Sequence, residues 1–392
     1  MYVYNRSTNS SATKRFEPPQ DRLSFHLRNF RRRRLERDIH RYDQTSSKDR
    51  TFFSDDRTVF YKDVCRQIPA SDVINLHWVA EFLDYGAFFD WLPGTMPLIW
   101  TLHDMSPFTG GCCYDLGCGK FTQSCGACPQ LGSKNDDDLT REMWKRKQKY
   151  YRAISSERFH IVTPSRWLGE EVQRSSLLAR FPRSVIPYGL NLDVFRPRDR
   201  RFAREILAIP FEAKVLLFIA QDISTERKGF PVLAKALETL QGENIFLLSL
   251  GIGGPPQVPG FAHVHIPSVN HDGLLALIYS AADVFVLPSL ADNLPNTMLE
   301  SIACGTPVVA FAAGGIPDTV RPGISGSLAQ PGDAAGLRSA ILEVLRDDSK
   351  RAEMSTNCRN IALAEYSLEL QAKRYVALYK SMLSVTNAKR AS

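Results

Sequence analysis

Two acidic residues, Asp292 and Glu300, stand with seven residues between them in a stretch that follows an apolar run. Pro295 predicts the start of a helix near Asn296, because proline suits the beginning of a helix. Asp292 would then lie in the loop before the helix and Glu300 about one turn inside it. Helix N-termini bind anions through unpaired N–H groups, and carboxylates accept hydrogen bonds from hydroxyls. This arrangement is expected to suit a ligand that carries both a diphosphate and a sugar.

A second stretch, Ile219-Ala-Gln-Asp-Ile-Ser-Thr-Glu-Arg-Lys-Gly229, offers positive charge. Lys228 carries a point charge on a flexible stem, and Arg227 has a planar fork that can bind two phosphate oxygens. Taken alone, an Arg-Lys-Gly triplet is usually a solvated turn. Beside the acidic pair it becomes a candidate phosphate site.

Both stretches follow predicted strands. From Ser71 onward, short β-branched runs alternate with longer amphipathic stretches, which predicts parallel sheets covered by helices. The predicted strands are 73–77, 98–103 and 159–163 in a first series, and 215–220, 245–251, 264–267, 284–288 and 307–312 in a second. In such sheets ligands bind beyond the carboxyl ends of the strands, which is where the two stretches lie.

The string DNLPNTMLESIACGTPVVAFAAGGIPD resembles the acid, seven residues, acid motif of retaining family-4 glycosyltransferases of the GT-B fold. In that family the first acid contacts the transferred sugar and the second the nucleotide ribose, which implies those roles for Asp292 and Glu300. The first acid is more familiar as glutamate. For an isolated Asp292, helix capping is the simpler interpretation. The resemblance also implies donor contacts by Asn293, Leu294, Asn296 and Thr297.

The stretch 219–229 resembles the family segment in which a lysine before a glycine holds the diphosphate, which implies this role for Lys228. Many relatives carry a further arginine earlier in the loop, where this chain has Gln221. Arg227 is therefore expected to bind the diphosphate together with Lys228. No metal or other cofactor is then needed for catalysis. Gly314 and Gly315 would either let the backbone approach a ligand closely or simply form a tight turn.

His103, in Ile99-Trp-Thr-Leu-His-Asp-Met-Ser-Pro-Phe-Thr-Gly-Gly111, matches a histidine of the family's acceptor domain. The resemblance implies that it hydrogen-bonds the sugar and supports charge on the leaving diphosphate. A lone histidine at a strand end is more often structural. His77, in Leu-His-Trp, is a weaker second candidate.

Five of the eight cysteines fall between positions 112 and 128. Four thiolates with a closing Cys-x-x-Cys suit tetrahedral zinc, whereas stable disulfides are improbable in a reducing compartment. The expected ligands of a structural zinc are Cys112, Cys118, Cys125 and Cys128, with Cys113 spare. Unligated core thiols are the alternative.

The formal net charge of +7 is concentrated in Arg22–Arg41, where eight arginines face Glu36 and Asp38. Leu23, Leu27 and Phe30 recur at helical spacing there, which predicts an amphipathic basic helix for an anionic membrane surface. A solvated arginine face is the alternative, and no aromatic-rich motif favours nucleic acid. No apolar run is long enough for a membrane span or a secretory signal, so a cytoplasmic protein, peripheral on the inner membrane face, is expected.

The length of 392 residues suits two domains. We expect an acceptor-side Rossmann-like domain over 1–190, a donor-binding Rossmann-like domain over 191–365, and a C-terminal helix over 366–392 that packs back on the first. Relatives open with a strand and a glycine-rich turn, and the first 23 residues resemble neither, so the N-terminal domain is expected to lack its first strand.

The expected reaction moves a sugar from a nucleotide-diphosphate sugar to an acceptor hydroxyl, with a lipid-linked or other saccharide as acceptor in surface polysaccharide synthesis. Two alternatives remain open. One is a nucleotide-sugar epimerase on the same fold, and the other is a non-catalytic protein that binds nucleotide or lipid.

Overall fold

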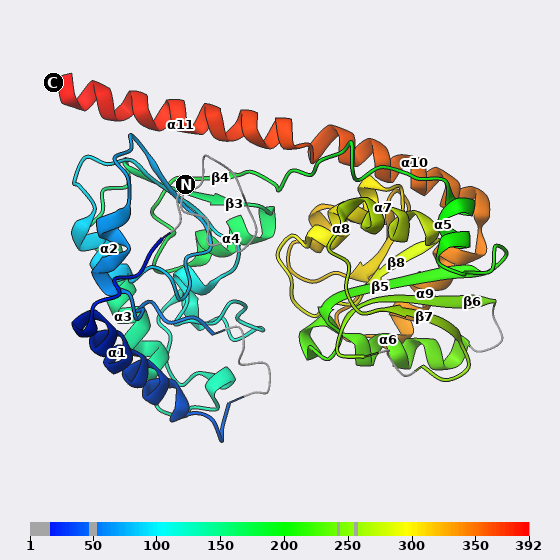
Figure 1. Cartoon of the computed structure of the whole chain (residues 1–392), viewed down its shortest axis with the longest axis horizontal. Coiled ribbons are helices and arrows are strands. Elements are labelled where there is room, and N and C mark those ends of the chain that lie inside the picture. Colours follow the sequence, from blue (N-terminus) through cyan, green and yellow to red (C-terminus); the bar gives the residue numbers. More distant parts are fainter. Residues whose placement is uncertain (1–15, 47–52, 241–243, 255–257, 392) are drawn as a thin grey trace. The chain divides into compact units, whose positions relative to one another are not determined.

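The computed structural model describes residues 16–46, 53–240, 244–254 and 258–391, with side chains described up to 384. The chain divides into two compact units (Figure 1). Unit 1 contains the residues up to Thr163, Gly169–Ser184 and the residues from Ala377 on. Unit 2 contains Pro164–Leu168 and Val185–Val376. Each unit is built around a sheet of its own.

Unit 1 has a four-stranded sheet in the order β1-β2-β3-β4, with β1 at one edge. Its strands are β1 (Ile74–Leu76), β2 (Leu98–Thr101), β3 (Phe159–Thr163) and β4 (Arg183–Val185). β1 pairs with β2 and β2 with β3 in parallel. The strands predicted in the first series are therefore present, and their carboxyl ends meet at one edge of the sheet.

Unit 1 contains α1 (Arg22–His40), α2 (Tyr85–Trp91) and α3 (Leu139–Arg152), while α4 (Arg166–Arg174) contributes residues to both units. α2 and α3 bury aromatic side chains, whereas α1 has no buried residue. Asp138 caps α3 by accepting hydrogen bonds from the N–H groups of Thr140 and Arg141. Tyr151 of α3 contacts Trp100 of the sheet edge to face, a geometry that aromatic pairs favour, and contacts Phe159 in a tilted arrangement.

Lys147 of α3 is the exception in this apolar packing, since its side chain is fully buried. Its ammonium donates to the carbonyl oxygens of Ser106 at 2.6 Å and Thr109 at 3.0 Å. A buried charge is tolerated only when it is hydrogen-bonded in this way. Lys147 thereby ties α3 to the loop that follows β2 and His103.

Unit 2 has a six-stranded parallel sheet in the order β10-β9-β8-β5-β6-β7. The strands are β5 (Lys214–Asp222), β6 (Ile245–Ile252), β7 (Ala262–Ile266), β8 (Val284–Leu287), β9 (Val308–Phe311) and β10 (Gly326–Ala329). The five predicted strands of the second series are present, and β10 was not predicted. β8 and β9 are buried along their whole length, as expected of strands covered on both faces.

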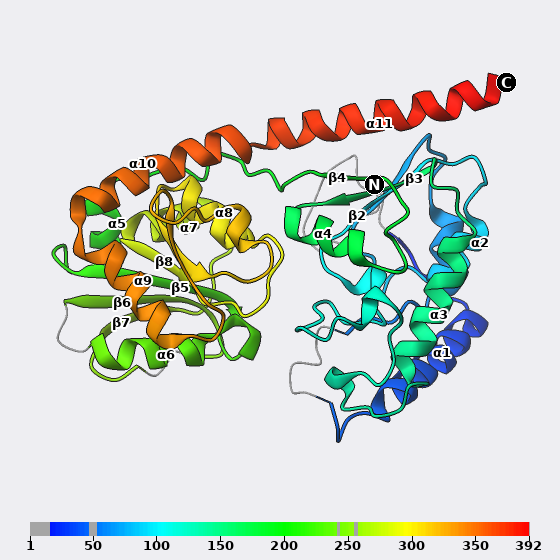
Figure 2. The ribbon, with the colours of Figure 1, turned by 180° about the vertical axis from the view of Figure 1, so that it is seen from behind.

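Helices cover this sheet on two sides (Figures 1 and 2). They are α5 (Arg200–Ile206), α6 (Phe230–Leu237), α7 (Asp272–Ala281), α8 (Asn296–Ala303), α9 (Ala334–Arg346) and α10 (Asp348–Glu365), and α11 (Leu368–Ala391) follows α10 in the chain. α6 packs with α9, whereas α7 packs with α5 and α8. The last part of α11 groups with unit 1, where Asn75 donates to the Tyr379 hydroxyl at 2.9 Å.

A buried carboxylate joins three elements of unit 2. Asp283, just before β8, accepts hydrogen bonds from the N–H of Val215 at 2.7 Å and from Arg204 at 2.8 Å. Arg200 lies 2.9 Å and Arg351 3.4 Å from the same carboxylate. These ion pairs fix α5 and α10 against the start of β8.

In the part of the chain that the structure describes, no helix is both long and apolar enough to cross a membrane.

Candidate functional site

The acidic loop follows β8 and leads into α8. The helix begins at Asn296 with Pro295 at its N-cap position, as predicted. No side chain caps α8, so Asp292 does not act as its N-cap. Instead the Asp292 carboxylate lies buried in the loop and accepts a hydrogen bond from the N–H of Asn293 at 3.1 Å. The N-terminus of α8 therefore remains available to an anion.

The cationic loop reaches the same carboxylate. Lys228 Nζ lies 2.8 Å from Asp292 Oδ2, and Arg227 Nη1 lies 3.3 Å from it. Arg227 also donates to the carbonyl oxygen of Ala291 at 2.5 Å, and its own carbonyl oxygen accepts from the N–H of Leu290 at 2.8 Å. Residues some 64 positions apart in the sequence are thus joined by side-chain and backbone bonds.

Two glycines allow the backbone segments to come this close. Gly229 follows Lys228 with a φ of +73°, and a Cβ at this position would lie 1.8 Å from the carbonyl oxygen of Pro288. Gly314 has a φ of +56°, and its Cβ would lie 1.8 Å from the carbonyl oxygen of Asp292. Any other residue would push the loop away. Gly314 and Gly315 lie in a turn after β9, as the tight-turn alternative expected, and the close approach at Gly314 is to the backbone of Asp292.

The charges at this point do not cancel. Lys228 and Arg227 contribute two positive charges and Asp292 one negative charge, which leaves a formal surplus of one positive charge. All three side chains are largely withdrawn from solvent. Charges in such surroundings interact more strongly than at an open surface. The loop pair is suited to binding a group with more than one negative charge.

Glu300 is the fifth residue of α8 and is held by a tyrosine from the neighbouring helix. The Tyr279 hydroxyl, on α7, donates to Glu300 Oε2 at 2.8 Å. Burial raises the pKa of Glu300, and the Tyr279 hydrogen bond opposes that rise. Burial also raises the pKa of Tyr279 well above its ordinary value, so its hydroxyl stays protonated and remains a donor. Sequence reasoning missed Tyr279, because nothing in its spacing marks it.

The other predicted donor-site residues lie around these groups. Asn293 and Leu294 are buried in the acidic loop, whereas Asn296 is exposed and Thr297 half-buried in the first turn of α8. Gln221 is exposed near the end of β5. The structure therefore joins Lys228, Arg227 and Asp292 by direct contacts and places Glu300 one turn along α8.

In unit 1, the two predicted histidines lie against each other at the ends of adjacent strands. His77 follows β1, His103 comes two residues after β2, and the distance from His77 Nδ1 to His103 Nε2 is 3.1 Å. Burial, and next the nearby His77, lower the pKa of His103 to about 4. Burial also lowers the pKa of His77. His103 is therefore a neutral imidazole at pH 7.

The geometry of unit 2 agrees with a known family. Residues 213–347, which contain Lys228, Asp292 and Glu300, match the family described as Glycosyl transferases group 1. The domain that matches this group 1 family lies in unit 2. The D-inositol 3-phosphate glycosyltransferases of Mycobacterium tuberculosis and Mycobacterium bovis are each 30% identical to it over 219 residues. That match spans 53% of this chain and 45% of each relative, so the chain aligns with less than half the length of either.

Solved structures extend the likeness to both units. Sucrose-phosphate synthase from Thermosynechococcus elongatus has a TM-score of 0.65 at 21% identity, covering 95% of this chain and 83% of that one. A glycosyltransferase from Rickettsia africae has a TM-score of 0.59 at 17% identity, covering 80% and 77%. HepE of Anabaena, solved with UDP-glucose, has a TM-score of 0.53 at 17% identity, covering 79% of each chain. The chain has the GT-B fold, as predicted.

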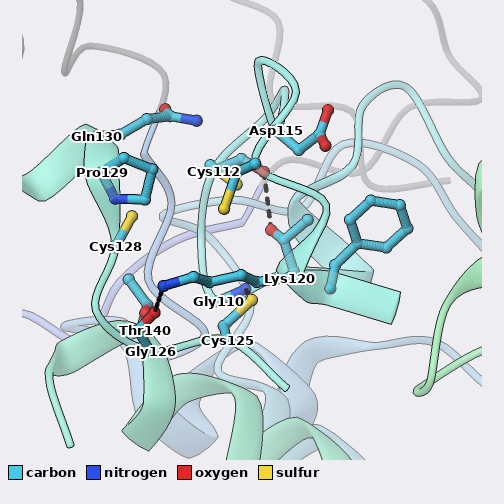
Figure 3. Close-up of a pocket in the computed structure, with 13 residues that line it drawn as sticks. Gly110, Cys112, Asp115, Lys120, Cys125, Gly126, Cys128, Pro129, Gln130 and Thr140 are labelled. Atoms are coloured by element: carbon cyan, nitrogen blue, oxygen red, sulfur yellow. Dashed lines mark hydrogen bonds between the residues drawn. The ribbon is translucent and has the colours of Figure 1, made fainter. Parts of the chain in front are cut away.

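Outside the group 1 domain, the cysteine-rich segment forms a small pocket (Figure 3). The four predicted zinc ligands, Cys112, Cys118, Cys125 and Cys128, all line it, and Cys113 does not. Its volume of about 20 Å³ leaves room for roughly one water-sized occupant. All eight cysteines are free thiols, and Cys125 Sγ accepts a hydrogen bond from the N–H of Gly110 at 3.1 Å.

The pocket also contains a lysine side chain. Among the described residues, no group of three or more His, Cys, Asp or Glu side chains could hold a metal ion. Figure 3 shows Lys120 in the same space, and its ammonium donates to the carbonyl oxygens of Gly126 at 2.9 Å and Ala127 at 2.8 Å. A neighbouring ammonium opposes the entry of a dication. The sequence located a shared pocket, and zinc itself stays a prediction.

Proposed function

We propose that this chain is a retaining glycosyltransferase that moves a sugar from a nucleotide-diphosphate sugar to an acceptor hydroxyl. The observation that carries the proposal is the meeting of Lys228, Arg227 and Asp292 ahead of the uncapped N-terminus of α8. HepE, which shares the fold, was solved in complexes with UDP and with UDP-glucose. The match to the group 1 family covers the residues that would bind such a donor.

The diphosphate would bind at the surplus positive charge. Asp292 Oδ2 holds the Lys228 ammonium at 2.8 Å. A diphosphate would compete for this ammonium and for Arg227, while the N–H groups of Asn296 and Thr297 would meet its remaining oxygens. These groups would stabilise the negative charge that develops on the leaving diphosphate without a metal ion.

The two acids would then bind hydroxyl groups. Released from Lys228, Asp292 would accept hydrogen bonds from the transferred sugar. Tyr279 fixes one oxygen of Glu300, and the other oxygen would accept from the nucleotide ribose. His103 would hydrogen-bond the sugar as a neutral imidazole, since its pKa of about 4 keeps it uncharged at pH 7. The retained anomeric configuration follows from the family resemblance of the two-acid motif.

The proposed acceptor is a saccharide, carried on a lipid in the synthesis of a surface polysaccharide. The mycobacterial relatives are named for an inositol phosphate acceptor, and sucrose-phosphate synthase for its product, so the shared fold serves several acceptors. A peripheral position at the inner membrane face would bring the chain to a lipid-linked acceptor.

Product analysis tests this proposal. UDP-, GDP- and ADP-sugars are incubated with the full chain and with lipid-linked saccharide acceptors, and sugar transfer and the anomer formed are followed by NMR. Asp292→Asn should lower the transfer rate about 100-fold or more, the usual scale for losing a group that acts in the transition state. Asp193→Asn, an exposed acid in the same unit, is the matched control and should transfer at the wild-type rate.

Two other results would point elsewhere. An isomerised sugar that forms without any acceptor would support an epimerase on the same fold. Donor binding with no turnover in either the wild-type chain or the variants would support a non-catalytic binding protein. An inverted anomer in the product would contradict retention while leaving transfer itself intact.

A further inference from the structure

The helix α1 is held on unit 1 by one of its faces. Arg31 donates to the carbonyl oxygen of Val59 at 3.3 Å, and its guanidinium lies 4.8 Å from the centre of the Tyr61 ring. Near the other end, Asp38 pairs with Arg57 at 3.1 Å, and Ile39 packs against a buried cluster in unit 1 that includes Leu139 and Met143. These contacts fix which side of α1 faces the protein.

An exposed side of α1 carries an ordered stripe. Leu23, Leu27 and Phe30 are 69%, 44% and 67% exposed. Three exposed arginines continue the same spacing of four and three residues, namely Arg34, Arg37 and Arg41. Residues at these intervals lie on one face of a helix. We call these six residues the outer stripe, which is apolar in its first half and cationic in its second.

The acidic residues of α1 do not neutralise the positive charge of the helix. Of the two acids in the segment from Arg22 to Arg41, Asp38 is already paired with Arg57 on the inner face. Asp38 also lies 3.7 Å from Arg41, whose side chain is 62% exposed. Ion pairs at exposed side chains contribute little to stability. Eight arginines against two acids leave a surplus of six positive charges.

We propose that the outer stripe of α1 docks on an anionic membrane surface. The guanidinium groups of the second half would bind lipid phosphates, while the side chains of the first half would enter the boundary between headgroups and acyl chains. A solvated arginine face would not need three large apolar side chains on the same line. Pairing with α1 of a second copy would bring two surpluses of six positive charges together, which is unfavourable.

Vesicle sedimentation with the full-length chain tests this inference. We expect the wild-type chain to bind phosphatidylglycerol-containing vesicles at least tenfold more tightly than pure phosphatidylcholine vesicles, and to lose this preference as salt is added. Leu23→Ser with Phe30→Ser, and separately Arg34→Gln with Arg37→Gln, should each weaken binding on the order of tenfold or more.

Matched controls distinguish the outer stripe from the chain's overall charge and exposed apolar surface. Phe25 is 55% exposed but lies two residues from Leu23 and Leu27, on another side of the helix, so Phe25→Ser should bind as the wild type does. Arg183→Gln with Arg196→Gln removes the same charge from exposed positions outside α1 and should also bind normally. Circular dichroism and melting temperatures should match the wild type for every variant, because the inner face of α1 is untouched.

The vesicle assay contains no sugar donor, so its outcome is independent of whether the chain transfers a sugar. Equal binding to neutral and anionic vesicles, or stripe variants that bind as the controls do, would overturn it. Binding to a single-stranded RNA homopolymer with no binding to anionic vesicles would overturn it too, and would assign the arginines to nucleic acid.

Discussion

The Lys228 ammonium lies 2.8 Å from Asp292 Oδ2, although the two residues come from loops that follow different strands. β5 and β8 are neighbours in the sheet of unit 2, so their carboxyl ends bring the two loops together. Asp292 and a bound diphosphate would therefore compete for the same cation. Binding of the donor and rearrangement of this ion pair are expected to be linked.

This competition predicts an unusual effect of Asp292→Asn. Because the substitution removes the carboxylate that holds Lys228, we expect a free nucleoside diphosphate to bind about fivefold more tightly, corresponding to roughly 1 kcal/mol. Sugar transfer should be lost in the same variant. Isothermal titration calorimetry with UDP, GDP and ADP measures the change. Weaker binding than in Asp193→Asn would show that Asp292 assists the diphosphate instead of competing with it.

The Tyr279 and Glu300 pair predicts a pH dependence. Glu300 must be ionised to accept hydrogen bonds from a ribose, and burial raises its pKa, so donor affinity should fall as the pH is lowered through that raised pKa. Tyr279→Phe removes the bond that opposes the rise, and the midpoint should move to higher pH. Affinity is followed by calorimetry between pH 4.5 and 8.

Two variants check this interpretation. Tyr366→Phe also deletes a buried tyrosine hydroxyl of unit 2, one that bonds Thr319, and should leave the midpoint unchanged. Glu300→Gln should bind weakly at every pH. A midpoint that stays in place in Tyr279→Phe would mean that Glu300 does not govern donor binding.

His103 predicts acid sensitivity of unit 1. Its pKa is about 4 in the folded chain against an ordinary 6.5, so between these values the unfolded chain binds a proton that the folded chain does not. Folding is therefore favoured above pH 6.5 and loses stability as the pH falls toward 4, by up to about 3 kcal/mol. His103→Gln should flatten the slope of stability against pH over this window. Equal slopes for the two proteins would contradict the low pKa.

The Asp283 ion pairs predict a contrast between two arginines. Arg204 is 5% exposed and Arg200 is 41% exposed, and both contact this buried carboxylate. Arg204→Ala should destabilise unit 2 by about 3 to 5 kcal/mol, since it leaves a buried charge short of partners. Arg200→Ala should cost about 1 kcal/mol or less. Thermal unfolding, with hydrogen exchange in β5 to assign the transition to unit 2, measures both. Equal effects would show that burial does not set the strength.

Much of the candidate site could be read from the sequence, because its features are local. β8 and β9 are continuous apolar runs, and Pro295 marks the start of α8. Lys228 and Asp292 each follow a strand, so the rule that ligands bind at carboxyl ends was enough to predict their meeting. β10 escaped prediction because its sequence, Gly326 to Ala329, has small residues and none that are β-branched.

Other features depend on distant pairs that spacing cannot reveal. The sequence around Tyr279 does not indicate its hydrogen bond to Glu300. The sequence around Asp283 likewise does not indicate its ion pair with Arg204, which is 79 positions away. Lysine is rarely buried, yet the Lys147 side chain lies buried under carbonyl oxygens. For the cysteines, spacing indicated four grouped residues, and these four line one pocket together with Lys120, which spacing did not indicate.

The most direct test of the donor site is the affinity of the chain for a nucleoside diphosphate when one lysine is removed. Calorimetry with UDP, GDP and ADP compares the wild-type chain, Lys228→Ala, and Lys235→Ala, an exposed lysine on α6 of the same unit. Loss of one charged hydrogen bond to phosphate should weaken binding in Lys228→Ala about tenfold or more. Lys235→Ala should match the wild type. Unchanged affinity in Lys228→Ala would contradict a diphosphate site at this loop and the transferase proposed from it.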